Sequence, residues 1–128
     1  MKNVLFVCVE NSNRSQMAQA FATIYGGTDV NAYSAGSRPS GKINPKAIAA
    51  MKELHYDLSS HQSKSLDDLP NITFEYAITM GCGDVCPFVH ANNRLDWNIP
   101  DPRDMNETEF REVRDLIRDK VKALLHLH

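Results

Sequence analysis

The hydrophobic positions in the first half of the chain form two strand-like runs and two helical stripes. Residues 2–9 are apolar and β-branched nearly throughout, which is typical of a strand buried on both faces of a parallel sheet. From residue 14 the apolar positions recur every three or four residues, which predicts a helix that ends at Gly26-Gly27. A short strand is predicted over residues 29–34, and Asn44-Pro45 supplies the cap and first turn of a second helix.

The second half continues the alternation of strands and helices. Residues 55–68 are polar and predict an irregular segment with one short helical turn. Residues 73–80 predict a third buried strand, and residues 95–99 predict a short fourth one. A last helix is predicted from Asn106, because this residue and Glu109 have the spacing of a capping pair. The apolar stripe of that helix comprises Phe110, Val113, Ile117, Val121 and Leu124.

Composition places the chain among ordinary globular proteins. It has 128 residues, of which 42% are hydrophobic and 23% charged, which excludes disorder and predicts one domain over residues 1–128. The order of elements predicts an α/β fold with a mainly parallel sheet of about four strands and helices on both faces. The net charge of −2 gives no basis for binding nucleic acid or an anionic membrane. The apolar run at residues 4–9 is too short to span a membrane, so we expect a cytoplasmic protein. No exposed heptad pattern suggests assembly, so we expect a monomer.

A cysteine and an arginine bracket a short polar loop between the first predicted strand and the first predicted helix. Cys8 ends the strand and Arg14 begins the helix. The carboxyl end of a parallel strand and the N-terminus of a helix are where such folds bind anions. The loop amides and Arg14 could hold one oxyanion, and the same positive groups favour the thiolate form of Cys8, which is a nucleophile. The expected oxyanion-binding residues are Glu10, Asn11, Ser12, Asn13, Arg14 and Ser15.

Three polar side chains of this loop have more specific expectations. Ser15 could hydrogen-bond the Cys8 thiolate and Asn11 could brace the loop, although both residue types are also common helix caps. Glu10 places a carboxylate inside an anion-binding loop. We expect its side chain to point outward to solvent, where it would not repel the anion.

Cys82 and Cys86 follow the third predicted strand in a glycine-punctuated segment. We therefore expect them at the same sheet edge as Cys8, which would allow thiol–disulfide exchange among the three cysteines. An odd number of cysteines argues against a fixed disulfide framework. The alternative is that these thiols are buried or exposed groups without a role.

A structural metal site is a further alternative for these cysteines. Zinc usually needs four ligands, and the additional candidates are His61 and His90. Neither histidine has a recognisable ligand spacing, and surface or capping roles are more typical for isolated histidines. We therefore predict no metal and no cofactor.

The chain resembles the low-molecular-weight tyrosine phosphatases over nearly its whole length. The resemblance rests on residues 4–8 leading into residues 11–18, on Tyr33-Ser34-Ala35-Gly36 and on Asn44-Pro45-Lys46-Ala47. Within that superfamily the chain is most similar to the thioredoxin-coupled arsenate reductases, whose Arg-Ser-Gln-Met-Ala pattern matches residues 14–18. The resemblance implies a phosphatase-like fold that binds arsenate and reduces it to arsenite.

The resemblance also implies a sequence of thiol reactions. Cys8 attacks arsenate, Cys8 and Cys82 form the first disulfide, and Cys82 and Cys86 form the last one. Thioredoxin reduces this last disulfide in similar proteins, and the short spacing between Cys82 and Cys86 leaves glutaredoxin as an alternative reductant.

The dipeptide Asp101-Pro102 matches the position from which the family draws its general acid. An aspartate beside the bound anion could protonate the departing oxygen, although Pro100-Asp101-Pro102 is also a simple turn. Phosphatases that act on phosphotyrosine commonly have an aromatic residue after this pair, whereas Arg103 and Asp104 follow here. The difference favours a small inorganic substrate.

Two other functions are compatible with the same residues. The chain could be a low-molecular-weight tyrosine phosphatase that forms a cysteinyl-phosphate, with incidental cysteines at positions 82 and 86. It could also be a non-catalytic module that binds oxyanions or a redox partner.

Overall fold

The computed structural model describes residues 2–80 and 89–126, and within these ranges four strands form one parallel sheet. The strands are β1 (Lys2–Cys8), β2 (Val30–Gly36), β3 (Thr73–Thr79) and β4 (His90–Asp96), in the order β2-β1-β3-β4. Every adjacent pair is parallel. The last five residues of β1 are buried, as expected for a central strand covered on both faces. The predicted sheet is confirmed.

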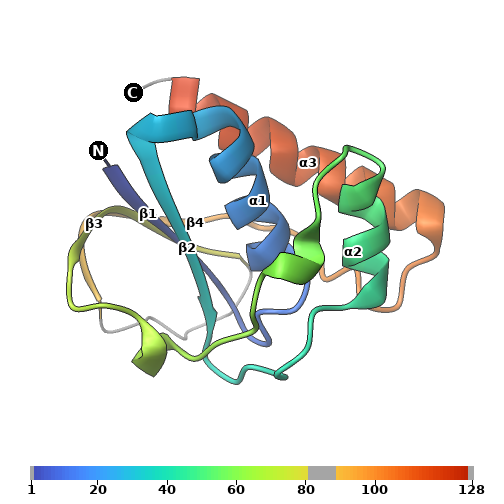
Figure 1. The fold of residues 1–128 in the computed structure, drawn as a ribbon, viewed down its shortest axis with the longest axis horizontal. Helices are drawn as coiled ribbons and strands as arrows, with labels where there is room; N and C mark the ends of the chain where they lie inside the picture. Colours follow the sequence, from blue (N-terminus) through green and yellow to red (C-terminus); the bar gives the residue numbers. More distant parts are fainter. Residues whose placement is uncertain (1, 81–88, 127–128) are drawn as a thin grey trace.

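The described residues form three α-helices, α1 (Arg14–Gly26), α2 (Pro45–Lys52) and α3 (Glu107–His126). Helix α3 packs against both α1 and α2, and Figure 1 shows the three helices next to one another. The expected α/β class, a single mainly parallel sheet of about four strands with flanking helices, is confirmed. The connection from α2 to β3 is polar and contains Pro70, so it forms only the short 3-10 helices η2 (Leu58–Ser60) and η3 (Leu66–Asp68).

The core lies between the sheet and these helices. The predicted stripe of α3 is buried along its whole length, and Phe6, Phe21 and Phe74 are fully buried with it. Leu66, Leu69 and Ile72 of the connection before β3 are partly buried and pack against the same core. Within residues 2–80 and 89–126, no helix is both long and apolar enough to cross a membrane.

The helix caps lie where the sequence places them. The Asn44 side chain accepts a hydrogen bond from the Lys46 N–H at 2.9 Å, and Pro45 follows as the first helical residue. At the start of α3, the Asn106 side chain accepts from the Glu109 N–H at 2.8 Å. The Glu109 carboxylate accepts in return from the Asn106 N–H at 3.4 Å. Both caps are local signals, and both are confirmed.

The position of β4 differs from the prediction. The strand covers His90–Asp96 instead of residues 95–99, and its pairing with β3 runs from Thr73–His90 to Thr79–Asp96. Its side chains are mostly polar and exposed because it lies at the sheet edge. This strand forms through its pairing with β3 and contains few hydrophobic residues, so the hydrophobic pattern of the sequence does not predict it.

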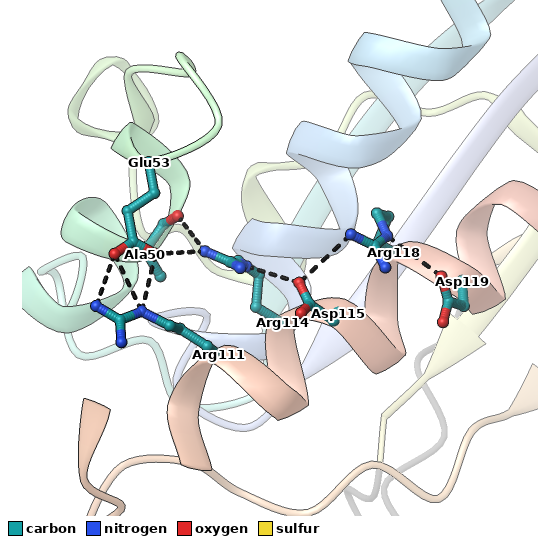
Figure 2. A network of polar contacts seen from close by, with 7 residues as sticks. All are labelled: Ala50, Glu53, Arg111, Arg114, Asp115, Arg118 and Asp119. Atoms are coloured by element: carbon teal, nitrogen blue, oxygen red, sulfur yellow. Dashed lines mark hydrogen bonds and ion pairs between the residues drawn. The ribbon is translucent and has the colours of Figure 1, made fainter. Parts of the chain in front are cut away.

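A charged network fixes α2 against α3, as Figure 2 shows. The nearly buried Arg114 of α3 donates to the Ala50 carbonyl at 2.9 Å and to the Glu53 carboxylate at 2.6 Å. Arg111 donates to the same carboxylate through Nε and Nη2. Hydrogen bonds from Arg111 and then Arg114 hold the pKa of Glu53 below its ordinary value. The network positions α2, whose first turn contacts the loop after β4.

Candidate active site

The loop between β1 and α1 is buried except at Val9 and Glu10, which are partly buried, and it is held from outside by backbone hydrogen bonds. Cys8 and Arg14, at its two ends, are 3% and 8% exposed. The loop carbonyls of Val9, Glu10 and Ser12 accept from the N–H groups of Arg38, Ser40 and Asn44. Gly36 lies so close that a Cβ there would be 2.6 Å from the Val9 carbonyl oxygen. The segment after β2 therefore fixes the loop, and glycine permits this approach.

Asn11 and Ser15 connect the loop to the cysteine. The Cys8 Sγ lies 2.9 Å from the Ser15 Oγ, and the Asn11 Nδ2 donates to the same hydroxyl at 2.7 Å. The Asn11 Oδ1 accepts from the Lys64 backbone N–H at 2.9 Å, which fixes the orientation of the amide. Either atom can donate in the contact between Ser15 and Cys8, and the Ser15 hydroxyl is the donor when the cysteine is a thiolate. The contact agrees with the expectation.

Asn11 has a backbone conformation that few residues adopt. Its φ is 51°, in the left-handed region that asparagine tolerates better than most side chains. Ser12 and Asn13 are also buried, but Asn13 makes no side-chain cap to α1. Its Oδ1 is a buried acceptor for which the described part of the chain provides no donor.

Gln16 and His61 extend this network and were not predicted from sequence. The buried Gln16 donates through Nε2 to the Asn11 Oδ1 at 2.8 Å and to the Gln62 carbonyl at 2.9 Å. Its Oε1 therefore accepts from the Nδ1 of His61 at 2.9 Å, and the His61 Nε2 accepts from the Tyr56 hydroxyl at 2.6 Å. His61 is thus a neutral, part-buried member of the loop support. Gln16 belongs to the Arg14–Ala18 motif, which was the available signal.

Burial lowers the pKa of His61 below its ordinary value of 6.5, and the nearby Lys64 lowers it further while Asp57 opposes the change. In the unfolded chain the imidazole binds a proton more readily, so protonation favours unfolding. We expect the free energy of unfolding to fall as the pH decreases below about 6.5, and His61→Gln to show a shallower decrease. Urea denaturation between pH 7 and pH 5 tests this, and equal slopes for both proteins would contradict it.

Arg14 is fixed by the ends of two other strands. Its Nη1 donates to the carbonyl of Met80, after β3, at 2.6 Å and to the carbonyl of Ile99, after β4, at 3.1 Å. Its Nη2 lies 4.0 Å from the Asp101 Oδ2. The planar guanidinium therefore has a defined orientation beside the cysteine loop and the aspartate.

A cavity of about 210 Å³ brings the predicted residues together. It is lined by Cys8, Val9, Glu10, Ser12, Asn13, Arg14, Asp101 and Arg103. The exposed Asp101 accepts a hydrogen bond from the Arg103 N–H at 3.1 Å. The Lys46 ammonium of α2 donates to the Met105 carbonyl at 3.0 Å and so holds the same loop. The buried part of the cavity contains a thiol and a guanidinium, which is suited to an oxyanion.

The other predicted site residues are the two further cysteines, Glu10 and the candidate metal ligands. Cys82 and Cys86 lie outside the described residues, which end at Met80 on this side. Glu10 is not directed to solvent alone, because its carboxylate pairs with the Nη1 of Arg103 at 2.9 Å. Among residues 2–80 and 89–126, no group of three or more histidine, cysteine or acidic side chains could hold a metal ion.

Comparison with known proteins agrees with this geometry. A family model described as low molecular weight phosphotyrosine protein phosphatase matches residues 3–127. Arsenate reductase 2 of Staphylococcus saprophyticus is 38% identical over an alignment of 125 residues that covers 94% of each chain. A solved arsenate reductase in the phosphate binding state has a TM-score of 0.90 and 34% identity, with 98% of both chains covered.

A further solved structure is that of a thioredoxin-dependent arsenate reductase from Corynebacterium glutamicum. It has a TM-score of 0.76 and 32% identity, and the match covers 98% of this chain and 60% of that one. The family model and these relatives all match nearly the whole of the present chain. The chain therefore belongs to the low molecular weight phosphotyrosine protein phosphatase family, together with relatives that are named arsenate reductases.

Proposed function

We propose that this protein is an arsenate reductase in which Cys8 is the nucleophile. The observation that carries the proposal is one cavity lined by the Cys8 loop, the fixed Arg14 and Asp101. Relatives that match nearly the whole chain are named arsenate reductases, and one was solved in a phosphate binding state. Arsenate has the shape and charge of phosphate, so the same loop suits both anions.

The first step forms a bond between sulfur and arsenic. The Cys8 thiolate, which accepts the Ser15 hydrogen bond, attacks arsenic, and one arsenate oxygen leaves as water. Asp101 supplies the proton that this oxygen needs. Arg14 and the loop amides hold the remaining oxygens, whose charge they stabilise through the reaction. The product is an arsenic(V) adduct on Cys8.

The second step is the reduction. The Cys82 thiolate attacks the Cys8 sulfur, and the electron pair of the sulfur–arsenic bond passes to arsenic. Arsenic(V) becomes arsenic(III), arsenite leaves, and Cys8 and Cys82 form a disulfide. Cys86 then attacks Cys82, which releases Cys8 and leaves a Cys82–Cys86 disulfide. Two electrons from a dithiol protein close the cycle.

We propose thioredoxin as this dithiol protein, with glutaredoxin as the alternative. A similar protein from Corynebacterium glutamicum is described as thioredoxin-dependent, which supports the first choice. The order of thiol exchange is supported by position in the sequence, since Cys82 follows Met80 by two residues and Met80 binds Arg14.

The direct test is arsenate-dependent NADPH oxidation with thioredoxin and thioredoxin reductase. We expect sustained turnover for the wild type, and at most a single turnover for Cys82→Ser and for Cys86→Ser. Replacing thioredoxin and its reductase by glutaredoxin, glutathione and glutathione reductase compares the two reductants. Multiple turnovers by Cys86→Ser with thioredoxin would show that the assigned relay is wrong.

A low-molecular-weight phosphatase is the second candidate, because the matching family model carries that description. It would hydrolyse a cysteinyl-phosphate with water and would need only one of the three cysteines. Hydrolysis of an aryl phosphate that requires Cys8 and is unaffected by Cys82→Ser, together with no arsenate reduction, would favour this candidate.

A further inference from the structure

The rim of the candidate active site contains an ion pair that links its two loops. Glu10 belongs to the loop after β1, and Arg103 follows the proposed acid Asp101. The Arg103 Nη1 lies 2.9 Å from the Glu10 Oε1, and the two side chains are 55% and 40% exposed. Both line the same cavity as the buried Cys8 and Arg14. The pair therefore lies on the solvent side of the anion position.

The charges of this pair act on any anion in the cavity. A carboxylate in an anion-binding loop repels the anion unless another charge compensates for it. Arg103 provides that compensation, and its backbone N–H also holds the Asp101 carboxylate. Because both side chains are partly exposed, dissolved salt weakens the attraction between them and their effect on an anion.

The position of the pair bears on which molecules could reach Cys8. A free inorganic oxyanion enters the cavity whole, whereas a phosphate ester must leave its organic group at the rim. Glu10 and Arg103 are partly exposed lining residues of the cavity, so the organic group of an ester would lie against them.

We propose that Glu10 and Arg103 form a specificity-determining pair. Joined, they cancel each other's charge beside the anion and close the rim to an ester's organic group, so the cavity accepts a small inorganic oxyanion. This inference deepens the proposed function and names the structural basis of its substrate class.

Anion binding tests the charge balance without requiring turnover. The measured quantity is the concentration of inorganic phosphate, or of arsenate, that halves the rate of Cys8 alkylation. Mass analysis of the Cys8 peptide gives that rate. Glu10→Gln leaves Arg103 uncompensated and should lower this concentration by about three- to tenfold. Arg103→Gln leaves Glu10 uncompensated and should raise it by about three- to tenfold. Both shifts should shrink in high salt.

The double variant and remote controls separate charge from structure. Glu10→Gln combined with Arg103→Gln should give a value between those of the single variants, because both charges are removed. Glu112→Gln and Lys52→Gln remove one exposed charge each away from the cavity and should produce no shift of this size. If both single variants shifted the protecting anion concentration in the same direction, the pair would only hold the two loops together. That result would overturn the proposal. Absence of protection by either anion in the wild type would also overturn it.

Ester exclusion is tested with p-nitrophenyl phosphate. In the double variant Glu10→Ala and Arg103→Ala, the Cys8-dependent kcat/KM for this ester should rise about tenfold over the wild type. An unchanged or lower value, with intact folding by circular dichroism, would overturn the exclusion. If the wild type binds phosphate with the expected variant shifts but does not reduce arsenate, the proposed function fails while this inference stands.

Discussion

Replacement of Arg14 by lysine should lower kcat/KM for arsenate reduction by about 10²- to 10³-fold. One end of the guanidinium already bonds to the Met80 and Ile99 carbonyls, which leaves its other donors for the anion. A lysine ammonium is a point charge and cannot make both sets of contacts in one plane. Steady-state NADPH oxidation measures the loss, and protection of Cys8 by phosphate measures the part that is due to binding.

The matched control is Arg103→Lys, a conservative change at the exposed arginine of the same cavity. Its single ion pair with Glu10 does not require a planar fork, so we expect a change of only a few fold. The Arg14 assignment is wrong if Arg14→Lys keeps more than about a tenth of the wild-type kcat/KM, because a loss of less than about tenfold is smaller than the loss typical of a removed oxyanion donor.

Replacement of Asn11 by alanine should lower the free energy of unfolding by about 3–5 kcal/mol. The side chain is fully buried and makes hydrogen bonds to Ser15, Gln16 and the Lys64 backbone. Alanine leaves these buried groups without partners and also fits the left-handed backbone poorly. Urea denaturation measures the loss, and a value under about 1 kcal/mol would mean that the network contributes no more than an ordinary hydrogen bond.

A second substitution at this position separates stability from thiol chemistry. Asn11→Asp keeps the acceptor for the Lys64 N–H and replaces the donor to Ser15 by an acceptor. The Ser15 hydroxyl is then attracted to the carboxylate and turns away from the Cys8 sulfur. We expect slower alkylation of Cys8 at pH 7 than in the wild type. Unchanged alkylation would show that Ser15 has no influence on the thiolate.

The parts of the fold that depend on residues close together in the sequence could be predicted. The Asn44 cap, the Asn106–Glu109 capping pair and the buried run of β1 are local signals, and the structure has each in the predicted place. β4 was misplaced because it is polar and pairs only at the sheet edge.

The same distinction applies to the candidate site. The loop from Cys8 to Arg14 is contiguous in sequence, so its residue types were enough to predict an oxyanion site. The contact between Gln16 and His61 joins residues 45 positions apart, and the ion pair of Glu10 with Arg103 joins residues 93 apart. Such contacts follow from the packing of the whole chain, which the sequence pattern does not specify.

The anchoring of Arg14 has an evolutionary consequence. Through the Met80 and Ile99 carbonyls this one side chain ties the start of α1 to the segments that follow β3 and β4. Selection for folding and selection for chemistry therefore act on the same guanidinium. A descendant that had lost its activity would be free to replace Cys8, a small side chain at the end of a strand, but would still need the arginine. Among distant homologues, retention of the arginine is thus a poor indicator of activity, and the cysteine is the better one.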